Sequence, residues 1–193
     1  MLVVFKNVKY KNLVVFDAEY NEGDIIQFSG IMFRKVQDDI FQVSKSINLY
    51  IKLPHNKQMN SFIERFTGIT DKFLEQDGED LFKAKRKIYE FLEAEGDILF
   101  VSHGLTNDRK ILLDNGIDFY ASKDESQDYY GSCTYNMAKR ILNREKNLSL
   151  TDIAMEAGWF IFNGHNAFDD AWANVAVFSL LKKLEDEKNE KIL

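Results

Sequence analysis

The chain has 193 residues, and at about 150 residues per domain this length predicts a single domain spanning residues 1–193. Hydrophobic residues make up 45% of the sequence and charged residues 29%, a balance that excludes intrinsic disorder for most of the chain. The formal net charge of -6 excludes a globally basic surface, so any role in binding nucleic acid would need a local site.

The sequence contains one cysteine, Cys133, and no apolar run long enough to cross a bilayer. One cysteine excludes an intrachain disulfide and a thiolate zinc site built from this chain alone. The N-terminal segment has two short apolar bursts split by lysines rather than a signal-peptide core. We therefore expect a cytoplasmic protein with no membrane contact.

Three apolar runs rich in branched and aromatic residues predict strands at Leu13 to Ala18, Ile25 to Arg34 and Phe41 to Leu53. The linkers between them, NEGD and QDD, have the length of turns. These strands are therefore expected to form an antiparallel meander, and Pro54 is expected to end the third strand.

The middle of the chain favours helices. A helix is predicted around Lys57 to Phe66, followed by a polar loop through Asp77 and Gly78. A longer helix follows, whose apolar residues recur at helical spacing: Leu81, Ala84, Ile88, Phe91 and Leu92. We expect Asp77 to cap its start and Gly96 to lie at its end.

The last third alternates strands and helices. Strands are predicted at Asp97 to Ser102 and Tyr129 to Thr134, and helices at Asn107 to Asn115, Tyr135 to Asn143, Ser149 to Ala157 and from Ala167 into the charged tail. This order predicts an α/β fold in which a mixed sheet of about five strands is flanked by helices. The core is expected at residues 11–184, and residues 185–193 are expected to fray.

Two acids end the first predicted strand. Asp17 and Glu19 lie two residues apart and therefore point to the same face. At ~4 Å and an effective dielectric of ~20, two such charges repel by roughly 4 kcal/mol, which a divalent cation would relieve. The alternative is a pair of acids that simply face water at a strand end.

Three further polar residues follow buried segments. Asp108 comes shortly after the predicted strand at Asp97 to Ser102, His165 precedes the last helix, and Asp170 lies in its first turn. Asp170 heads an inward row that continues with Asn174, Val177 and Leu181, whereas Asp169 points elsewhere. Each residue alone also fits helix capping or charge compensation at a helix start. Their joint occurrence with the acid pair favours a metal site.

Four segments carry a resemblance to a known family. They are FDAEY, FTGIT at Phe66 to Thr70, SHGLTND and HNAFDD. In order and spacing they resemble the DEDDh 3′-5′ exonucleases, the DnaQ-like branch of the ribonuclease H-like superfamily, over roughly Leu13 to Leu181. The resemblance implies a ribonuclease H-like α/β fold.

The resemblance also implies roles for individual residues. It implies that Asp17, Glu19, Asp108 and Asp170 are the metal-binding acids and that His165 is the histidine that defines the subgroup. The implied substrate contacts are Ala18, Tyr20, Phe66, Thr67, Gly68, Ile69, His103 and Asn107. The chain departs from the family pattern at Gly104, at Asn107, and at Tyr20 and Asn21, which leaves the preference for DNA or RNA open.

The implied reaction is hydrolysis at the 3′ end of single-stranded DNA or RNA, with release of nucleoside 5′-monophosphates. Two Mg²⁺ or Mn²⁺ ions would be held by the four acids, and His165 would accept a proton from the attacking water. Two alternatives remain open: a catalytically silent nucleic-acid-binding module of the same fold, and a phosphodiesterase acting on small oligonucleotides.

The partner implied by this reading is a single-stranded 3′ end. A basic rim could come from Arg109, Lys110, Lys139, Arg140 and Arg144, although a solvated helix face explains each of them equally well. Phe66 and Tyr20 are candidate stacking residues, and the two tryptophans, Trp159 and Trp172, are assigned to packing. Any polymerase or helicase partner would be a separate chain, and the protein could be a monomer or a homodimer.

Overall fold

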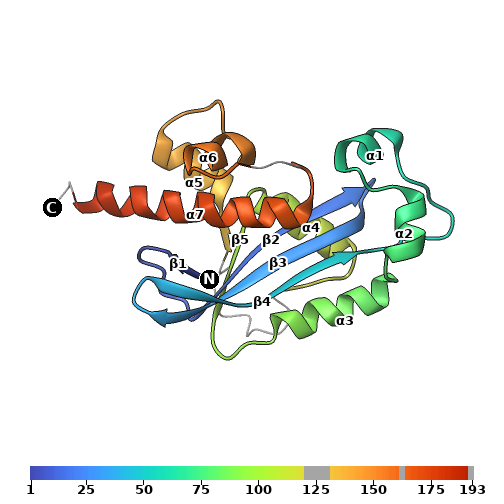
Figure 1. Ribbon diagram of the computed structural model, residues 1–193, viewed down its shortest axis with the longest axis horizontal. Coiled ribbons are helices and arrows are strands. Elements are labelled where there is room, and N and C mark those ends of the chain that lie inside the picture. The colour runs from blue at the N-terminus through green and yellow to red at the C-terminus, as the bar shows by residue number, and fades with distance from the viewer. Residues whose placement is uncertain (120–130, 161–163, 191–193) are drawn as a thin grey trace.

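The computed structural model describes residues 1–119, 131–160 and 164–190. Its centre is a six-stranded sheet in the order β1-β4-β3-β2-β5-β6 (Figure 1). The strands are β1 (Leu2–Val4), β2 (Asn12–Asn21), β3 (Asp24–Gln37), β4 (Ile40–Tyr50), β5 (Ile98–Ser102) and β6 (Gly131–Cys133). β2, β3 and β4 form the expected antiparallel meander, while β5 lies parallel to β2 and β6 parallel to β5.

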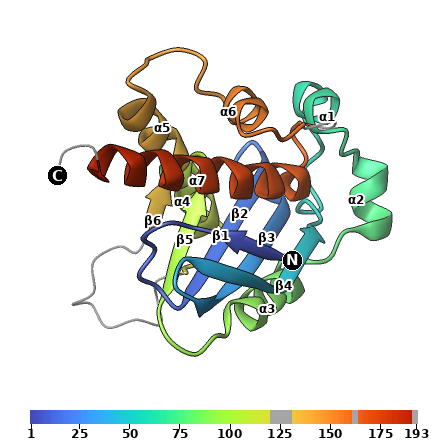
Figure 2. The ribbon, with the colours of Figure 1, turned by 60° about the vertical axis from the view of Figure 1, so that its left-hand side comes forward.

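Helices cover both faces of this mixed sheet. They are α1 (Ser61–Thr67), α2 (Asp71–Asp77), α3 (Leu81–Leu92), α4 (Leu105–Asp114), α5 (Thr134–Leu142), α6 (Leu150–Glu156) and α7 (Ala167–Glu190). The long helix α7 crosses one face with α5 and α6 beside it, and α3 packs on the opposite face (Figures 1 and 2). α1 and α2 lie together beyond the end of the sheet where β2 finishes (Figure 1).

The alternation of side chains along β2 divides the core into two layers. Val15 packs with Phe178 of α7 on one side, and Phe16 packs with Ile88 of α3 on the other. All four of these side chains are almost completely buried. Because β2 is central and covered on both faces, it reads as a continuous apolar run. The residue that follows this run, Asp17, is thereby brought to the edge of the core.

One strand more is present than we expected. Leu2–Val4 forms β1, which pairs antiparallel with β4 at the edge of the sheet. Phe5, directly after it, is fully buried against Phe33 and Phe41, so the core reaches in front of residue 11. Three residues are too few to show the alternating pattern that identifies a strand. The partner strand also lies almost forty residues away, so no local signal indicates the pairing.

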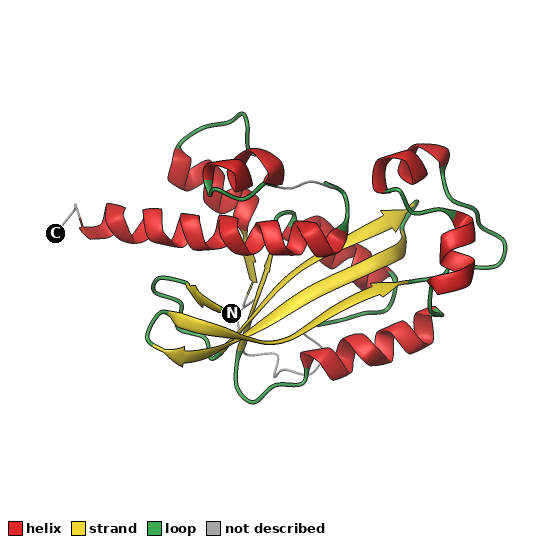
Figure 3. Cartoon of the chain, in the orientation of Figure 1, coloured by secondary structure: helices red, strands yellow, loops and turns green. Residues whose placement is uncertain are grey.

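The prediction of a polar loop before α3 is partly wrong. Asp71–Asp77 forms helix α2, whose start is capped by the Thr70 hydroxyl accepting a hydrogen bond from the Phe73 backbone N–H at 3.1 Å. The cap of α3 is Asp80 and not Asp77, because the Asp80 carboxylate accepts from the Lys83 N–H at 2.9 Å. The two short helices beyond the end of the sheet, α1 and α2, are seen in Figure 3.

The C-terminal helix is longer than predicted. α7 runs to Glu190, and Glu185 within it forms an ion pair with Arg140 of α5, so residues 185–190 are helical rather than frayed. Residues 191–193 and Tyr129 lie outside the described residues. Among the helices that the structure describes, none is long and apolar enough to span a bilayer.

The two tryptophans differ in their surroundings. Trp172 on α7 packs edge-on against Phe33, with ring centroids 6.4 Å apart, as the assignment to packing predicted. Trp159 follows α6 and is 39% exposed, so its ring is only partly packed. Trp172 belongs to a helical stripe whose direction follows from its neighbours, whereas Trp159 lies after the turn that ends α6, in a segment with no such periodicity.

Candidate active site

The C-terminal part of β2 places two carboxylates on the α7 side of the sheet. Val15 faces α7, so Asp17 and Glu19, at the same parity, face the same way. The pairing of β2 with β3 is regular as far as Glu19, and its register shifts between Glu19 and Tyr20. Both acids are half-buried, and Tyr20, after the shift, is exposed. The two acids therefore share one side of the sheet, as predicted.

The third acid, Asp108, is buried in the first turn of α4. The Ser102 hydroxyl at the end of β5 donates a hydrogen bond to its Oδ2 at 2.5 Å. Burial raises the pKa of Asp108 to about 6, opposed by hydrogen bonds from Ser102 and from the Gly104 backbone N–H. The strand, the turn and the helix start thus hold this carboxylate from three sides.

The fourth acid, Asp170, lies in the first turn of α7, and its Oδ2 accepts the backbone N–H of His165 at 3.0 Å. His165 has a φ of +69°, in the left-handed region that few non-glycine residues adopt. Burial raises the pKa of Asp170 to about 6, with this hydrogen bond opposing it. The loop conformation and the acid therefore stabilise each other.

The four acids lie close enough to repel one another. Burial raises the pKa of Asp17 well above its ordinary value, and the charges of Asp108, Glu19 and Asp170 raise it further. Burial, Asp170 and Asp108 together raise the pKa of Glu19 to about 7. Three segments far apart in the sequence therefore meet at one end of the sheet, near the start of α7 (Figure 1).

The chemistry of this group fits a hard divalent cation. Single ligand atoms of Glu19, His165 and Asp170 all lie within 4.8 Å of one another. Within the described part of the chain, no ion pair involves any of the four acids. Carboxylate oxygens are the ligands that Mg²⁺ and Mn²⁺ prefer, and a bound cation would offset the mutual repulsion.

A column of three aromatic rings stands beside the acids. Phe66 of α1 stacks on the His165 ring with centroids 3.5 Å apart, and Phe62, one turn earlier, stacks on Phe66 at 5.6 Å. Phe66 is 45% exposed and Phe62 60% exposed. Partial burial lowers the pKa of His165 below its ordinary value. Exposed stacked rings next to a histidine and four acids suit a flat, charged ligand.

Comparisons with known proteins bear on what this group does. The model of the exonuclease family matches residues 14–178 of the chain, which include all four acids and His165. This chain belongs to the exonuclease family. Members of this DEDDh-type family use divalent metal ions, and the acidic group described above provides a site of that kind. No curated protein is similar enough in sequence to match.

Solved structures share the fold of this chain at low sequence identity. The nuclease domain of 3′hExo, a DEDDh family member bound to rAMP, is 15% identical with a TM-score of 0.72, covering 92% of this chain and 94% of that one. E. coli exonuclease I in complex with a dT13 oligonucleotide is 18% identical with a TM-score of 0.74. That comparison covers 94% of this chain but 43% of exonuclease I. The predicted DEDDh resemblance and the ribonuclease H-like fold are confirmed.

The segment after α1 is held by hydrogen bonds to the helix. The Thr67 hydroxyl donates to the Ile63 carbonyl at 2.9 Å and accepts the Ile69 N–H at 3.1 Å. Gly68 ends α1 with a φ of +74°, a conformation that favours glycine. Ile69 is buried with Leu74, so any contact of Ile69 with a nucleotide would come from its backbone.

The remaining predicted substrate contacts differ in accessibility. Tyr20 and Asn107 are exposed, Asn107 in the same helical turn as Asp108. The Ala18 side chain is buried on the opposite face of the sheet, which leaves only its backbone toward the acids. Both ring nitrogens of His103 are engaged inside the protein, as described below. These contacts stay predictions.

The predicted basic rim is largely paired with acids. Lys110 pairs with Asp114 at 2.5 Å, Lys139 with Glu145 at 2.7 Å, Arg140 with Glu185 at 2.6 Å and Arg144 with Glu156 at 2.7 Å. Arg109 is half-buried. Exposed ion pairs are weak and can exchange for a phosphate, but they also support the alternative of a solvated helix face.

Two features of the site, Phe62 and Ser102, are not predicted from the sequence. Phe62 lies four residues before Phe66, a spacing that signals a shared helical face and could have been noticed. The Ser102 hydroxyl on Asp108 had no comparable signal, because a serine at a strand end is common and its partner depends on the turn that follows. The tertiary contact alone identifies Ser102.

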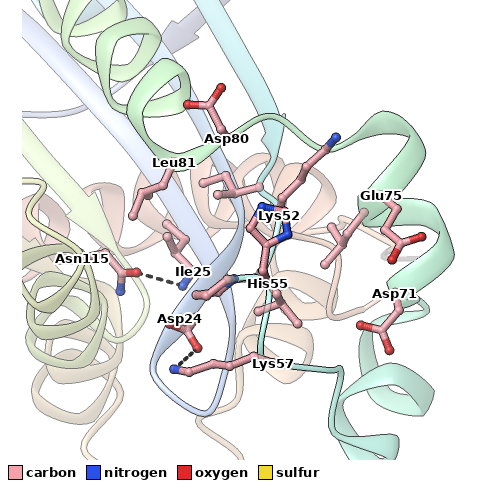
Figure 4. A pocket seen from close by; sticks show the side chains of 14 residues that line it. Asp24, Ile25, Lys52, His55, Lys57, Asp71, Glu75, Asp80, Leu81 and Asn115 are labelled. Carbon is pink, nitrogen blue, oxygen red and sulfur yellow. Dashed lines mark hydrogen bonds and ion pairs between the residues drawn. The ribbon is translucent and has the colours of Figure 1, made fainter.

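A cavity of about 540 Å³ lies apart from the acids (Figure 4). It lies between the β2–β3 turn, α2 and the start of α3, where Lys57 pairs with Asp24 at 2.5 Å and Asn115 accepts the Ile25 N–H at 3.3 Å. Among the described residues that line it are none of the four acids and not His165. The candidate site is therefore located by the charges of its side chains, since none of the acids lines this cavity.

Proposed function

We propose that this chain is a metal-dependent 3′-5′ exonuclease that removes nucleoside 5′-monophosphates from the 3′ end of single-stranded DNA or RNA. One observation carries the proposal: four carboxylates without ion-pair partners among the described residues converge beside an exposed histidine. The similar structures include a nuclease domain bound to rAMP and an exonuclease bound to dT13, which supports a nucleic-acid 3′ end as substrate.

Asp17, Glu19, Asp108 and Asp170 would hold the divalent cations, for which we propose two Mg²⁺ or Mn²⁺ ions. When bound, these ions would neutralise charge on the phosphate, acidify the attacking water and stabilise the departing 3′-oxygen. The chain contributes preorganisation, because Ser102 and the His165 backbone already orient two of the carboxylates. Little rearrangement would then be needed when cations bind.

His165 is the proposed general base. As the water oxygen bonds to phosphorus and the bond from phosphorus to the 3′-oxygen breaks, the imidazole would take the water proton. Its lowered pKa keeps the ring neutral near pH 7, as a base must be. Phe66 stacks on the ring and so restricts its orientation.

Exposed groups beside the acids would bind the terminal nucleotide. The terminal base would stack on the exposed ring of Tyr20 or contact the exposed edge of Phe66, and the Thr67–Gly68 turn would contact its sugar or phosphate. Such stacking requires an unpaired end, which favours single strands over duplexes. Asn107 and Tyr20, where the chain departs from the family pattern, are the positions we expect to influence the choice between DNA and RNA.

A degradation assay tests the proposal. A dinucleotide and longer single strands of DNA and RNA, labelled at every nucleotide, are incubated with Mn²⁺ or Mg²⁺, and parallel strands carry a blocked 3′ end. We expect stepwise shortening from the free 3′ end, mononucleotide products and resistance of the blocked strand. Binding without shortening would indicate the silent module, and cleavage confined to dinucleotides would indicate the small-oligonucleotide enzyme.

Two neighbouring acids provide a matched pair for this assay. We expect Asp170→Asn to slow cleavage by ~10² to 10⁴-fold, as loss of a catalytic group does. Asp169→Asn removes the same charge one position along α7 and should stay within about threefold of wild type, because a partly solvated charge outside the group acts only through screened electrostatics. A fully active Asp170→Asn protein would refute the ligand assignment.

A further inference from the structure

A buried polar chain connects three elements behind the acids. The Thr134 hydroxyl oxygen at the start of α5 lies 3.0 Å from Nδ1 of His103 and 2.7 Å from Oδ1 of Asn174 on α7. Nε2 of His103 lies 2.9 Å from the Leu148 carbonyl oxygen, in the loop before α6. Thr134 and Asn174 are almost completely buried. Polar groups this deep in a protein are rarely without a specific arrangement of hydrogen bonds.

Two members of this chain, His103 and Asn174, are each close in sequence to a residue that carries or holds one of the acids. His103 follows Ser102, whose hydroxyl donates to Asp108. Asn174 lies one helical turn after Asp170, on the same inward row. The chain therefore spans the distance between the β5–α4 turn, which carries one acid, and α7, which carries another.

Counting protons gives the chain a direction. The Leu148 carbonyl can only accept, so Nε2 of His103 carries the proton. In a neutral ring Nδ1 of His103 is then an acceptor. The Thr134 hydroxyl has a single proton and donates it to Nδ1 at 3.0 Å, because its other acceptor, the Ser102 carbonyl, is more distant at 3.4 Å. The Thr134 oxygen must then accept from Asn174, through the amide nitrogen.

This direction also solves a second problem. When Oδ1 of Asn174 faces Thr134, Nδ2 is buried without a hydrogen-bond partner in the described structure. Rotating the amide by half a turn presents Nδ2 to Thr134 and satisfies the donor. Burial lowers the pKa of His103, opposed by its hydrogen bond to Leu148, which favours the neutral ring that this arrangement requires.

We propose that His103, Thr134 and Asn174 are positioning residues, forming a chain of hydrogen bonds from the Asn174 amide through Thr134 and His103 to Leu148 that fixes the separation of Asp108 and Asp170. The proposal rests on the proposed function. Repulsion between the acids pushes the β5–α4 turn away from α7, and the chain opposes it. On this view His103 acts through the metal-binding acids and does not contact substrate.

Thr134 allows a sharp test. Thr134→Val has nearly the same shape and removes the hydroxyl, whereas Thr134→Ser keeps the hydroxyl and loses a methyl group. We expect Val to raise the Mn²⁺ concentration for half-maximal cleavage by ~10-fold or more, the size of effect seen when groups supporting metal ligands are removed. The KM for the oligonucleotide should be unchanged, and Ser should behave like wild type.

Three outcomes would overturn the proposal. The first is a Val variant with the Mn²⁺ requirement of wild type. The second is a Ser variant impaired as strongly as Val together with a lowered melting temperature, which would indicate packing alone. The third is a His103→Gln variant that raises the KM for the oligonucleotide without changing the Mn²⁺ requirement, which would make His103 a substrate contact.

Two measurements separate this proposal from the proposed function, because neither needs cleavage. Calorimetric titration with Mn²⁺ should show weaker binding to Thr134→Val than to wild type. Nitrogen NMR of the ring should show His103 neutral with its proton on Nε2 at pH 7, and a charged ring would overturn the chain direction. If wild type cleaves no substrate but still binds Mn²⁺ more tightly than Thr134→Val does, the proposed function is refuted and the positioning role is not.

Discussion

At the scale of single residues, His165 combines features that suit a proton acceptor. It is exposed, it lies between α1 and the start of α7, and Phe66 stacks on its ring. Its backbone, in the left-handed region, donates to Asp170. The same residue thus contributes a side chain to the site and a backbone group that orients an acid. We expect its replacement to change the side-chain role alone, because the backbone donor is kept.

A pH profile tests this role. At saturating Mn²⁺, cleavage by wild type should fall as the pH drops through the pKa of His165, which lies below the usual value of about 6.5 because burial disfavours the charged ring. His165→Ala should slow cleavage by ~10² to 10⁴-fold and lose this acidic limb. His55→Ala serves as the control, because His55 is exposed and lines the cavity that lies apart from the acids. An unchanged limb in His165→Ala would rule out the base.

At the scale of elements, the start of α7 orders much of the site. Asn166 precedes the helix, and its side-chain oxygen accepts the Phe168 N–H at 3.1 Å. Gln27 of β3, fully buried, accepts the Ala167 N–H at 3.2 Å. Because β3 pairs with β2 at Gln27 and Glu19, the strand that presents one acid also anchors the helix that presents another.

Substitution at Asn166 separates its two contributions. Asn166→Ala should lower the free energy of unfolding by about 1 kcal/mol through loss of the cap, and should slow cleavage because His165 and Asp170 adjoin the cap. Asn166→Ser keeps a capping oxygen but loses the side-chain contact with Tyr50. Urea unfolding should therefore show Ser near wild type. Equal destabilisation by both variants would show that capping contributes little.

The elements themselves were predictable to different degrees. The strands β2, β3 and β5 and the helix α3 have long or strongly periodic apolar patterns, and these patterns predict their positions. Helix α2 was missed because its seven residues bury one side chain, Leu74, so its periodicity is weak. Its cap, Thr70, is a residue type that commonly starts helices, but it also belongs to the FTGIT segment, whose family resemblance implies a substrate contact.

At the scale of the whole molecule, the acids reduce the stability of the metal-free protein. Their folded-state pKa values, about 7 for Glu19 and about 6 for Asp108 and Asp170, exceed the ordinary values near 4. The folded state therefore holds protons that the unfolded state has released. Stability is lost as the pH rises from about 4 through about 7, and the full penalty applies above that range.

A comparison of two proteins isolates this effect. Without metal, Asp170→Asn should be more stable relative to wild type at pH 8 than at pH 5, because the variant lacks one of the repelling charges. Mn²⁺ should raise the melting temperature of wild type at pH 8 and raise that of the variant much less. Thermal unfolding with and without Mn²⁺ measures both. A pH-independent difference between the two proteins would contradict repulsion among the acids.

The order of the motifs and the apolar patterns already specify the fold class, the family resemblance and the five residues around which the proposed chemistry is built, since these depend on residue type and spacing along the chain. Contacts between distant segments depend on how the layers pack. The stacking of Phe66 on His165, the Ser102 hydrogen bond to Asp108 and the chain through Thr134 therefore emerge only in the folded molecule. Local patterns encode which face of an element is buried, whereas packing determines which buried groups meet.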